Sequence, residues 1–197
     1  MKRLSLLTLL LLLLLPLSHS FAGDFDKGFM AYEAGNYTAA LNEFTSLAEQ
    51  GEVRSQFLLA QMYRRAQGVI EDEKESVKWY RLAAEQGIVA AQNWLGFVYQ
   101  NGNGVVKNDR EAARWFRLAS EQGLANAQNN LGFAYKNGDG VIKDNVYAHM
   151  WFNIAASSGY EDAKKNGYIL ARKMTREQIA RAQDLAKECI QKNHKNC

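Results

Sequence analysis

The sequence predicts an all-α protein, a right-handed α-solenoid of stacked helix-turn-helix repeats that ends in a C-terminal capping helix. Two series of residues recur at intervals of 36 positions: Gly51, Gly87, Gly123 and Gly159, and Trp79, Trp115 and Trp151. The segments 79–107 and 115–143 are identical at 19 of 29 positions. A fixed period of this length is typical of supersecondary units that bury their apolar faces only by stacking on a neighbour.

The first 22 residues are predicted to be a secretory signal peptide that is cleaved after Ala22. Lys2 and Arg3 give it a charged start, and an almost unbroken apolar run follows from Leu4 to Leu17. This run is shorter than the roughly 20 residues that a helix needs to cross a bilayer, which favours a cleaved signal over the alternative of an uncleaved membrane anchor. After cleavage no second apolar stretch is long enough to span a membrane. We therefore expect an exported protein, located in the periplasm or, as the alternative, secreted into the medium.

The charge of the mature protein argues against one class of partner. Cleavage removes Lys2 and Arg3, so the formal charge falls from +3 to +1. A nearly neutral protein gives no support to nucleic-acid binding through bulk charge.

The next segments are predicted to form one helical pair each: 23–51, 52–87, 88–123 and 124–159. In the first helix of the third pair, Ala91, Leu95 and Tyr99 follow one another at helical spacing. Gly96 and Gly132 stand where a helix prefers alanine by roughly 1 kcal/mol, so we expect another helix to approach closely there.

Glycine pairs are predicted to end the first helix of a repeat, because glycine readily adopts the left-handed backbone of a helix terminus. Gly102 with Gly104 and Gly138 with Gly140 are such pairs, whereas Ala66 takes the first position in the earlier copy. Two other interpretations are weaker. A phosphate-binding loop would need a preceding strand and a Gly-Lys-Ser/Thr ending, and a calcium loop would need a leading carboxylate and a glutamate at its twelfth position.

These motifs carry a family resemblance. The pattern A-x-x-x-L-G-x-x-Y-x-x-G-x-G-V, followed by A-x-x-W-[FY]-x-x-A-[AS]-x-Q-G, resembles the Sel1-like repeat family, and the segment 23–51 is similar to a tetratricopeptide repeat. The resemblance implies an exported α-solenoid that acts as an adaptor, a signalling regulator or a host-contact protein. It implies a protein or peptide partner, no cofactor and no enzymatic activity.

The C-terminal segment, 160–197, departs from the repeat and is predicted to contain a terminal helix, a capping helix and a tail. Thr175 and Gln178 form a capping box ahead of a helix that runs from Arg176 to about Gln191. Cys189 and Cys197 are expected to form a disulfide in an oxidising compartment, with free thiols or an intermolecular link as alternatives. Such a bond closes a small loop and would hold only the last helix and the tail.

The sequence shows no set of residues suited to catalysis or to metal binding. The mature protein has two histidines, His149 and His194, and a single cysteine pair, so we expect no catalytic residue and no zinc site. The spacing of the cysteines is also similar to a cysteine-rich branch of the Sel1-like family. That resemblance implies the alternative function, a cell-wall-related or β-lactam-type protein that binds or hydrolyses its ligand.

A binding surface is predicted on the first helix of each repeat, on the side opposite Leu95 and Tyr99. In tetratricopeptide arrays this side lines a concave groove, and the resemblance implies the same here. The candidate partner-binding residues, related by 36-residue offsets, are Arg64, Asn93, Phe97, Gln100, Asn129, Phe133, Lys136 and Arg172. Basic and amide donors beside an aromatic stripe suit an acidic or carboxylate-bearing peptide. The alternative is a solvated helix face, with the two phenylalanines packed between neighbouring first helices. We also expect the protein to be a monomer.

Overall fold

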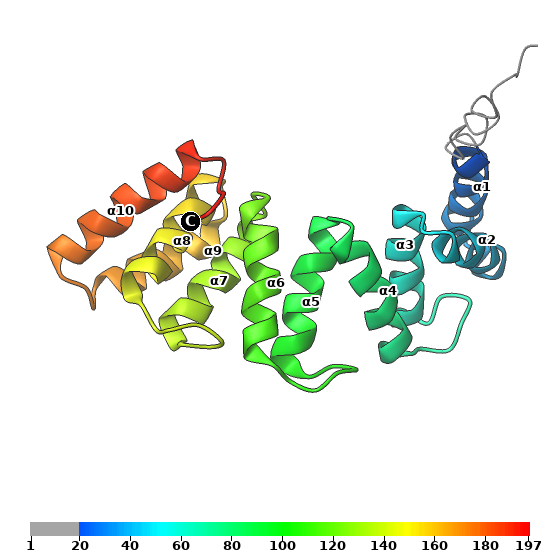
Figure 1. Cartoon of the computed structure of the whole chain (residues 1–197), viewed down its shortest axis with the longest axis horizontal. Helices are drawn as coiled ribbons and strands as arrows, with labels where there is room; N and C mark the ends of the chain where they lie inside the picture. The colour runs from blue at the N-terminus through cyan, green and yellow to red at the C-terminus, as the bar shows by residue number, and fades with distance from the viewer. Residues whose placement is uncertain (1–19) are drawn as a thin grey trace, which may run out of the picture.

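The computed structural model describes residues 20–197, which form ten helices and no strand (Figure 1). In sequence order the helices are α1 (Ser20–Glu33), α2 (Tyr37–Glu49), α3 (Val53–Arg64), α4 (Glu73–Glu85), α5 (Val89–Asn101), α6 (Asp109–Glu121), α7 (Ala125–Asn137), α8 (Asn145–Ser157), α9 (Glu161–Ala171) and α10 (Arg176–Gln191). The predicted all-α solenoid is confirmed. The predicted signal peptide lies outside the described residues except for its last three positions.

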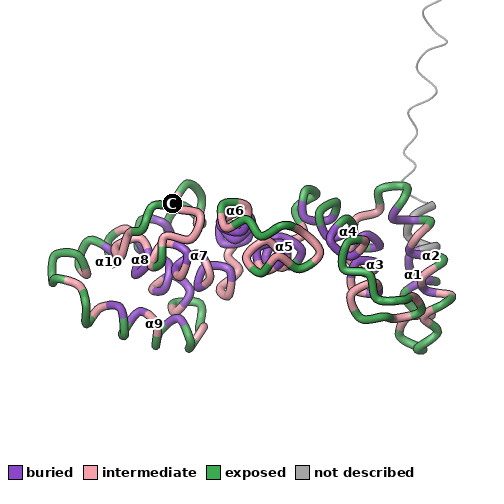
Figure 2. The backbone as a smooth tube through the Cα atoms, turned by 90° about the horizontal axis from the view of Figure 1, so that it is seen from below, coloured by how far each residue is buried: buried purple, intermediate pink, exposed green. Residues whose placement is uncertain are grey.

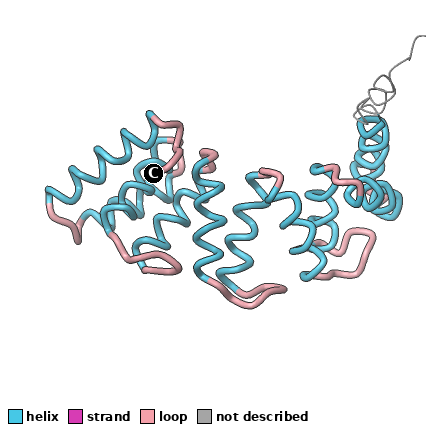
Figure 3. The backbone as a smooth tube through the Cα atoms, viewed as in Figure 1, coloured by secondary structure: helices cyan, strands magenta, loops and turns pink. Residues whose placement is uncertain are grey.

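Consecutive helices pack against one another along the long axis of the molecule. The pairs α1–α2, α3–α4, α5–α6 and α7–α8 are each in contact, and every second helix also contacts the first helix of the next pair. The longer loops after α5 and α7 lie on one edge of the stack, and the short turns after α4 and α6 lie on the opposite edge (Figure 3). None of the helices in residues 20–197 has the length and apolar character needed to cross a membrane.

Capping side chains define where the second helices begin. Asp72, Asn108 and Asp144 each accept two backbone N–H groups, at the starts of α4, α6 and α8. Such caps satisfy donors that have no partner within the helix. The helices α5 and α7 end, as predicted, at glycines in the left-handed conformation: φ is 80° at Gly102 and 87° at Gly138.

The close helix approach predicted at Gly96 and Gly132 is confirmed. A Cβ atom at Gly96 would lie 2.3 Å from a ring carbon of Phe116, and one at Gly132 would lie 2.7 Å from a ring carbon of Phe152. These distances are far below van der Waals contact, so the α5–α6 and α7–α8 pairs need glycine at these positions. Buried residues accordingly follow the helix sides that face a neighbour, and loops and outer sides are intermediate or exposed (Figure 2).

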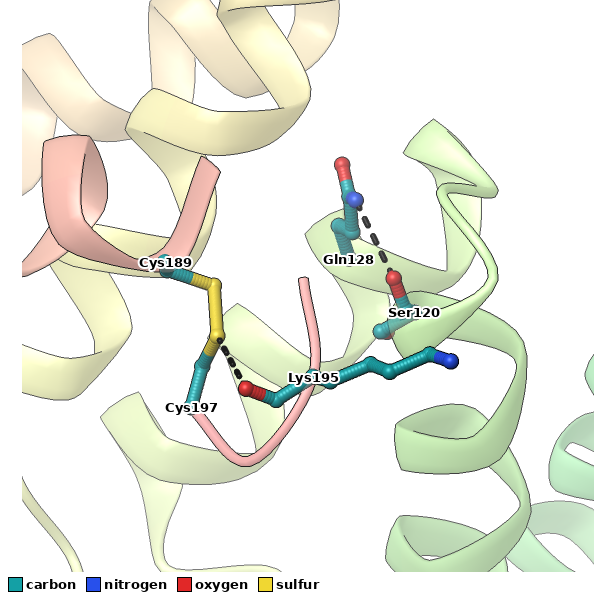
Figure 4. The surroundings of a disulfide bond; sticks show 5 residues. All are labelled: Ser120, Gln128, Cys189, Lys195 and Cys197. Atoms are coloured by element: carbon teal, nitrogen blue, oxygen red, sulfur yellow. Dashed lines mark hydrogen bonds between the residues drawn. A yellow bond between two sulfur atoms is a disulfide. The ribbon is translucent and has the colours of Figure 1, made fainter. Parts of the chain in front are cut away.

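The helix α10 packs against α8, and it begins with the predicted capping box between Thr175 and Gln178. Cys189, in its last turn, is joined to Cys197 by a disulfide. The tail between the two cysteines passes beside the end of α6 and the start of α7, close to Ser120 and Gln128 (Figure 4). The tail therefore lies against the turn between α6 and α7, where a Cβ atom at Gly123 would be 3.7 Å from the His194 ring.

Candidate functional site

We define the first-helix face as the side of α3, α5, α7 and α9 on which residues remain partly exposed to solvent; this is the outward side of these helices. On α5, the residues Ala91, Gln92, Asn93, Leu95, Gly96 and Val98 are buried. The side that keeps some exposure is marked by Ala90, Trp94, Phe97 and Asn101, which follow helical spacing. This outward strip of α5 is where the structure forms a cavity.

Trp94 is the central residue of this strip. The protein has four tryptophans, and the other three are 7%, 2% and 1% exposed, whereas Trp94 is half-buried. Its ring lies 5.8 Å from that of Tyr80 on α4, measured between centroids. Trp94 therefore covers the junction between the second and third helical pairs and still presents part of its indole to solvent.

Arg64, a predicted site residue, stacks on this tryptophan. Its Cζ atom lies 4.6 Å from the centre of the Trp94 ring, in the range of a cation–π interaction. Its Nε atom is buried and has no hydrogen-bond partner among the described residues. Burial raises the pKa of the neighbouring Tyr80 hydroxyl, and a hydrogen bond and the positive charge of Arg64 oppose that rise. The Arg64 guanidinium therefore lies between the indole of Trp94 and the phenol of Tyr80, and its Nε–H group has no hydrogen-bond partner among the described residues.

Two cavities adjoin Trp94. The larger, of about 200 Å³, is lined by Trp94, Phe97, Val98, Asn101 and Asn103. The smaller, of about 20 Å³, is lined by Arg64, Glu73, Ser76, Val77, Trp94, Val98 and Asn103. The smaller has room for about one water molecule, while the larger can hold a side chain. None of these residues belongs to α10 or to the tail.

The two predicted phenylalanines pack on the second helix of their own pair. Phe97 meets Phe116 edge to face at 5.5 Å, and Phe133 meets Phe152 in the same way at 5.2 Å. Each ring also packs on a cluster that contains residues of the next first helix: Leu131 on α7 for Phe97, and Leu170 on α9 for Phe133. Both rings remain half-buried, and Lys136 Nζ lies 5.0 Å from the centre of the Phe133 ring.

The two predicted asparagines are less accessible than the sequence indicated. Asn93 is 9% exposed and Asn129 is 6% exposed. The next first helix covers each of them and donates a hydrogen bond to its Oδ1: Asn130 Nδ2 at 3.5 Å to Asn93, and Asn166 Nδ2 at 2.9 Å to Asn129. The expectation that they lie outside the core was wrong, because the packing of adjacent first helices encloses them.

The remaining candidates lie near the C-terminal ends of the first helices. Gln100 and Lys136 are half-buried and Arg172 is exposed. We define the basic edge as the five cationic residues at these ends: Arg64, Arg65, Lys136, Arg172 and Lys173. None of the five forms an ion pair within residues 20–197. Cations are favoured at helix C-termini, but this interaction does not require an ion pair. These side chains can therefore still bind an anion.

Sequence reasoning missed Trp94, although the sequence held a signal for it. The positions equivalent to Trp94 at 36-residue offsets are Leu58, Asn130 and Asn166, while buried positions such as Leu95 and Leu131 keep their residue. A large aromatic residue at a position that changes between copies indicates a local role that the repeated core does not require.

His149 and the two cysteines, which the sequence offered for catalysis or metal binding, lie in the core or in a disulfide. His149 is buried, burial lowers its pKa, and its Nδ1 lies 2.9 Å from Asn153 Nδ2. Cys189 and Cys197 are joined to each other. Within the described residues, no three His, Cys, Asp or Glu side chains are grouped so that they could hold a metal ion.

The helical pairs and their glycine-terminated first helices define an α-solenoid repeat protein. The family model of the Sel1 repeat matches residues 53–88, 89–124 and 125–160, which together make up more than half of the sequence. The protein therefore belongs to the Sel1 repeat family.

Among the solved structures similar to this protein are two that are 30% identical to it. A Sel1 repeat protein from Oxalobacter formigenes is 30% identical, with a TM-score of 0.70, over 88% of this protein and 72% of that one. A protective antigen present in uropathogenic Escherichia coli strains, which displays an SLR fold, is 30% identical over 88% of this protein, with a TM-score of 0.62. Only 46% of that antigen is covered, so the present protein spans less than half of its length. A search of curated proteins found no match.

Proposed function

We propose that this protein is an exported, non-catalytic scaffold that binds a protein or peptide partner along its first-helix face, and that the bound segment carries acidic side chains or a free carboxylate. Sel1 repeat proteins are generally protein-interaction scaffolds, which supports the class of activity. Export is supported by the signal-like N-terminal sequence and by the cysteine pair, since disulfides persist mainly in oxidising compartments.

The observation that carries the proposal is the basic edge. Its five cations lie at the ends of α3, α7 and α9, and no carboxylate among the described residues pairs with them. Between them, the end of α5 offers the amides of Gln100 and Asn101. Cationic and amide donors in one row match the oxygens of an acidic segment, and such complementarity steers association and selects partners.

The alternative of a cell-wall or β-lactam ligand finds less support. In the cysteine-rich branch that suggested it, disulfides connect the end of one helix to the start of the next. Here the bond connects the last turn of α10 to the tail that follows it. We therefore favour the scaffold.

A charge-reversal experiment tests the proposal. The double variant Lys136→Glu/Arg172→Glu changes the basic edge, and the control Arg110→Glu/Lys187→Glu makes the same change in net charge on α6 and α10. Binding of fluorescent acidic peptides and of basic peptides is measured by polarisation at low and high salt. We expect the first variant to lose about tenfold or more in affinity for acidic peptides, the control to bind like the wild type, and salt to weaken binding. Equal affinity in the two variants, or a preference for basic peptides, would contradict the proposal.

A further inference from the structure

We infer that the cavity beside Trp94 is the anchor pocket of the first-helix face, and that it takes a large apolar side chain of the partner that stands next to a carboxylate, which Arg64 binds. This inference rests on the proposed function and names the part of the partner that is recognised. The carboxylate is that of an Asp or Glu side group or of the partner's own C-terminus, and both present the same two oxygens to a guanidinium.

The apolar walls of this pocket occur in only one of two closely matched repeats. Phe97 and Asn101 have identical equivalents on α7, at positions 133 and 137. The other three lining residues change: Trp94, Val98 and Asn103 correspond to Asn130, Ala134 and Asp139. The exchange removes an indole and two methyl groups and adds a negative charge. The α7 surface is therefore unsuited to an apolar side chain beside a carboxylate, and the α5 surface is suited to it.

Arg64 supplies the charge complement to this apolar wall. Its guanidinium lies against the indole, and its buried Nε has no acceptor within residues 20–197. A buried donor without a partner costs free energy, and an incoming carboxylate reaches this Nε only when the Arg64 side chain shifts on binding. Glu73 also lines the small cavity but forms no ion pair with Arg64 in this part of the protein. An incoming carboxylate therefore meets a cation that forms no ion pair with another described residue, although Glu73 lies at the same small cavity.

The rim of the pocket can hold the backbone of a peptide. Asn101 Nδ2 donates to the carbonyl of Phe97 at 2.9 Å, which orients this amide and leaves its Oδ1 free to accept. Asn103 is exposed on the same rim. Amide groups can both donate to and accept from a peptide backbone. Trp94 and Arg64 also belong to the residue types, tryptophan, tyrosine and arginine, that most often dominate the binding energy of an interface.

The fluorescence of the protein reports directly on this pocket, because Trp94 is the one tryptophan that is not buried. The test uses synthetic acidic peptides that differ only at the C-terminal residue, Leu or Ser, which follows a Glu; each is made with a free and with an amidated C-terminus. Binding is followed by polarisation of a dye on the peptide and, separately, by the tryptophan emission of the protein and its quenching by acrylamide. The variants are Trp94→Asn, which installs the α7 residue, and Arg64→Gln. The control is Ile142→Ala, which removes an apolar side chain that is 90% exposed and does not line the pocket.

We expect the Leu peptide to bind about tenfold more tightly than the Ser peptide, to shift the emission and to protect Trp94 from quenching. Trp94→Asn should abolish the difference between the two peptides, and Arg64→Gln should weaken both, while Ile142→Ala should change nothing. Loss of binding on amidation would assign the carboxylate to a C-terminus, and unchanged binding would assign it to an Asp or Glu residue.

Two results would overturn the inference. If Leu and Ser peptides bind equally, with no change in Trp94 emission, acidic segments bind the basic edge without this anchor, and the proposed function stands alone. If no acidic peptide binds at all, both fail. Thermal unfolding of Trp94→Asn guards against a folding defect, and the emission of the wild-type protein remains a valid readout if that variant is unstable.

Discussion

The outward surfaces of α5 and α7 are built on the same scaffold and differ in chemistry. Both helices bury the same Leu, Gly and Gln positions, both end at a left-handed glycine, and both carry a phenylalanine that meets the second helix edge to face. On α5 the outward strip carries Trp94 and a cavity, whereas on α7 the same strip carries Asn130, which bonds to the preceding repeat. The repeated positions maintain the fold, and the positions that change between copies are where a partner can be distinguished.

The largest effect should come from the glycines that both repeats share. Gly96→Ala places a methyl group 2.3 Å from the Phe116 ring, and we expect it to lower the free energy of unfolding by about 2–3 kcal/mol. Gly132→Ala should cost a similar or slightly smaller amount. Urea unfolding measures both.

Gly167→Ala is the matched control, because a methyl group there would lie 3.5 Å from its nearest neighbour, at ordinary contact distance. It should stabilise the protein by up to about 1 kcal/mol, the helix preference for alanine. If Gly96→Ala left the free energy of unfolding as high as Gly167→Ala does, the close packing of α5 against α6 would be contradicted.

The next effect compares two kinds of junction between first helices: those joined by a pair of asparagines and the one covered by Trp94. Asn166→Ala leaves the buried Oδ1 of Asn129 without its donor at 2.9 Å, and we expect a loss of about 1–2 kcal/mol. Asn130→Ala removes a longer bond of 3.5 Å to Asn93 and should cost less. Neither variant should change the affinity for acidic peptides, because neither residue lines the Trp94 cavity. A large loss of peptide binding in either would show that the amide junctions take part in recognition.

A smaller effect, an increase in stability, is expected in the loop after α3, where alanine stands at the position of a glycine in the next two repeats. Ala66 has φ of 53°, in the left-handed region that Gly102 and Gly138 occupy in the later copies. Ala66→Gly should raise the free energy of unfolding by about 0.5–1 kcal/mol, because it relieves a strained backbone. Gly102→Ala should shift the thermal midpoint in the opposite direction. A drop in stability for Ala66→Gly would show that the alanine conformation is not strained.

The helices α6 and α8 differ at one titratable position, and we expect this position to make the free energy of unfolding depend on pH. His149 on α8 occupies the position of Ala113 on α6, and burial lowers its pKa below the ordinary value of 6.5. Between the folded and unfolded pKa values the unfolded protein binds more protons, so the free energy of unfolding should fall as the pH drops below 6.5. His149→Gln should flatten this pH dependence in urea titrations. An unchanged slope in His149→Gln would assign the acid sensitivity to other groups.

Much of the fold could be predicted because it depends on local periodicity. The 36-residue repeat, the left-handed helix ends, the capping box at Thr175 and the close approach at Gly96 all follow from residue spacing and backbone preference. The burial of Asn93 could not be predicted, because it depends on how tightly the next first helix lies against it. Trp94 and its cavity depend on the same interhelical geometry, together with the position of Arg64 thirty residues earlier.

The central claim is that the α5 surface, and not the α7 surface, holds the partner's apolar anchor. Crosslinking with an acidic peptide that carries photo-leucine as its C-terminal residue, after a Glu, followed by mass spectrometry of the digested protein, tests this directly. The adducts should map to Trp94, Phe97 and their neighbours within residues 89–103. Adducts distributed equally over α5 and the matching segment 125–139, or concentrated on the second helices, would contradict the claim.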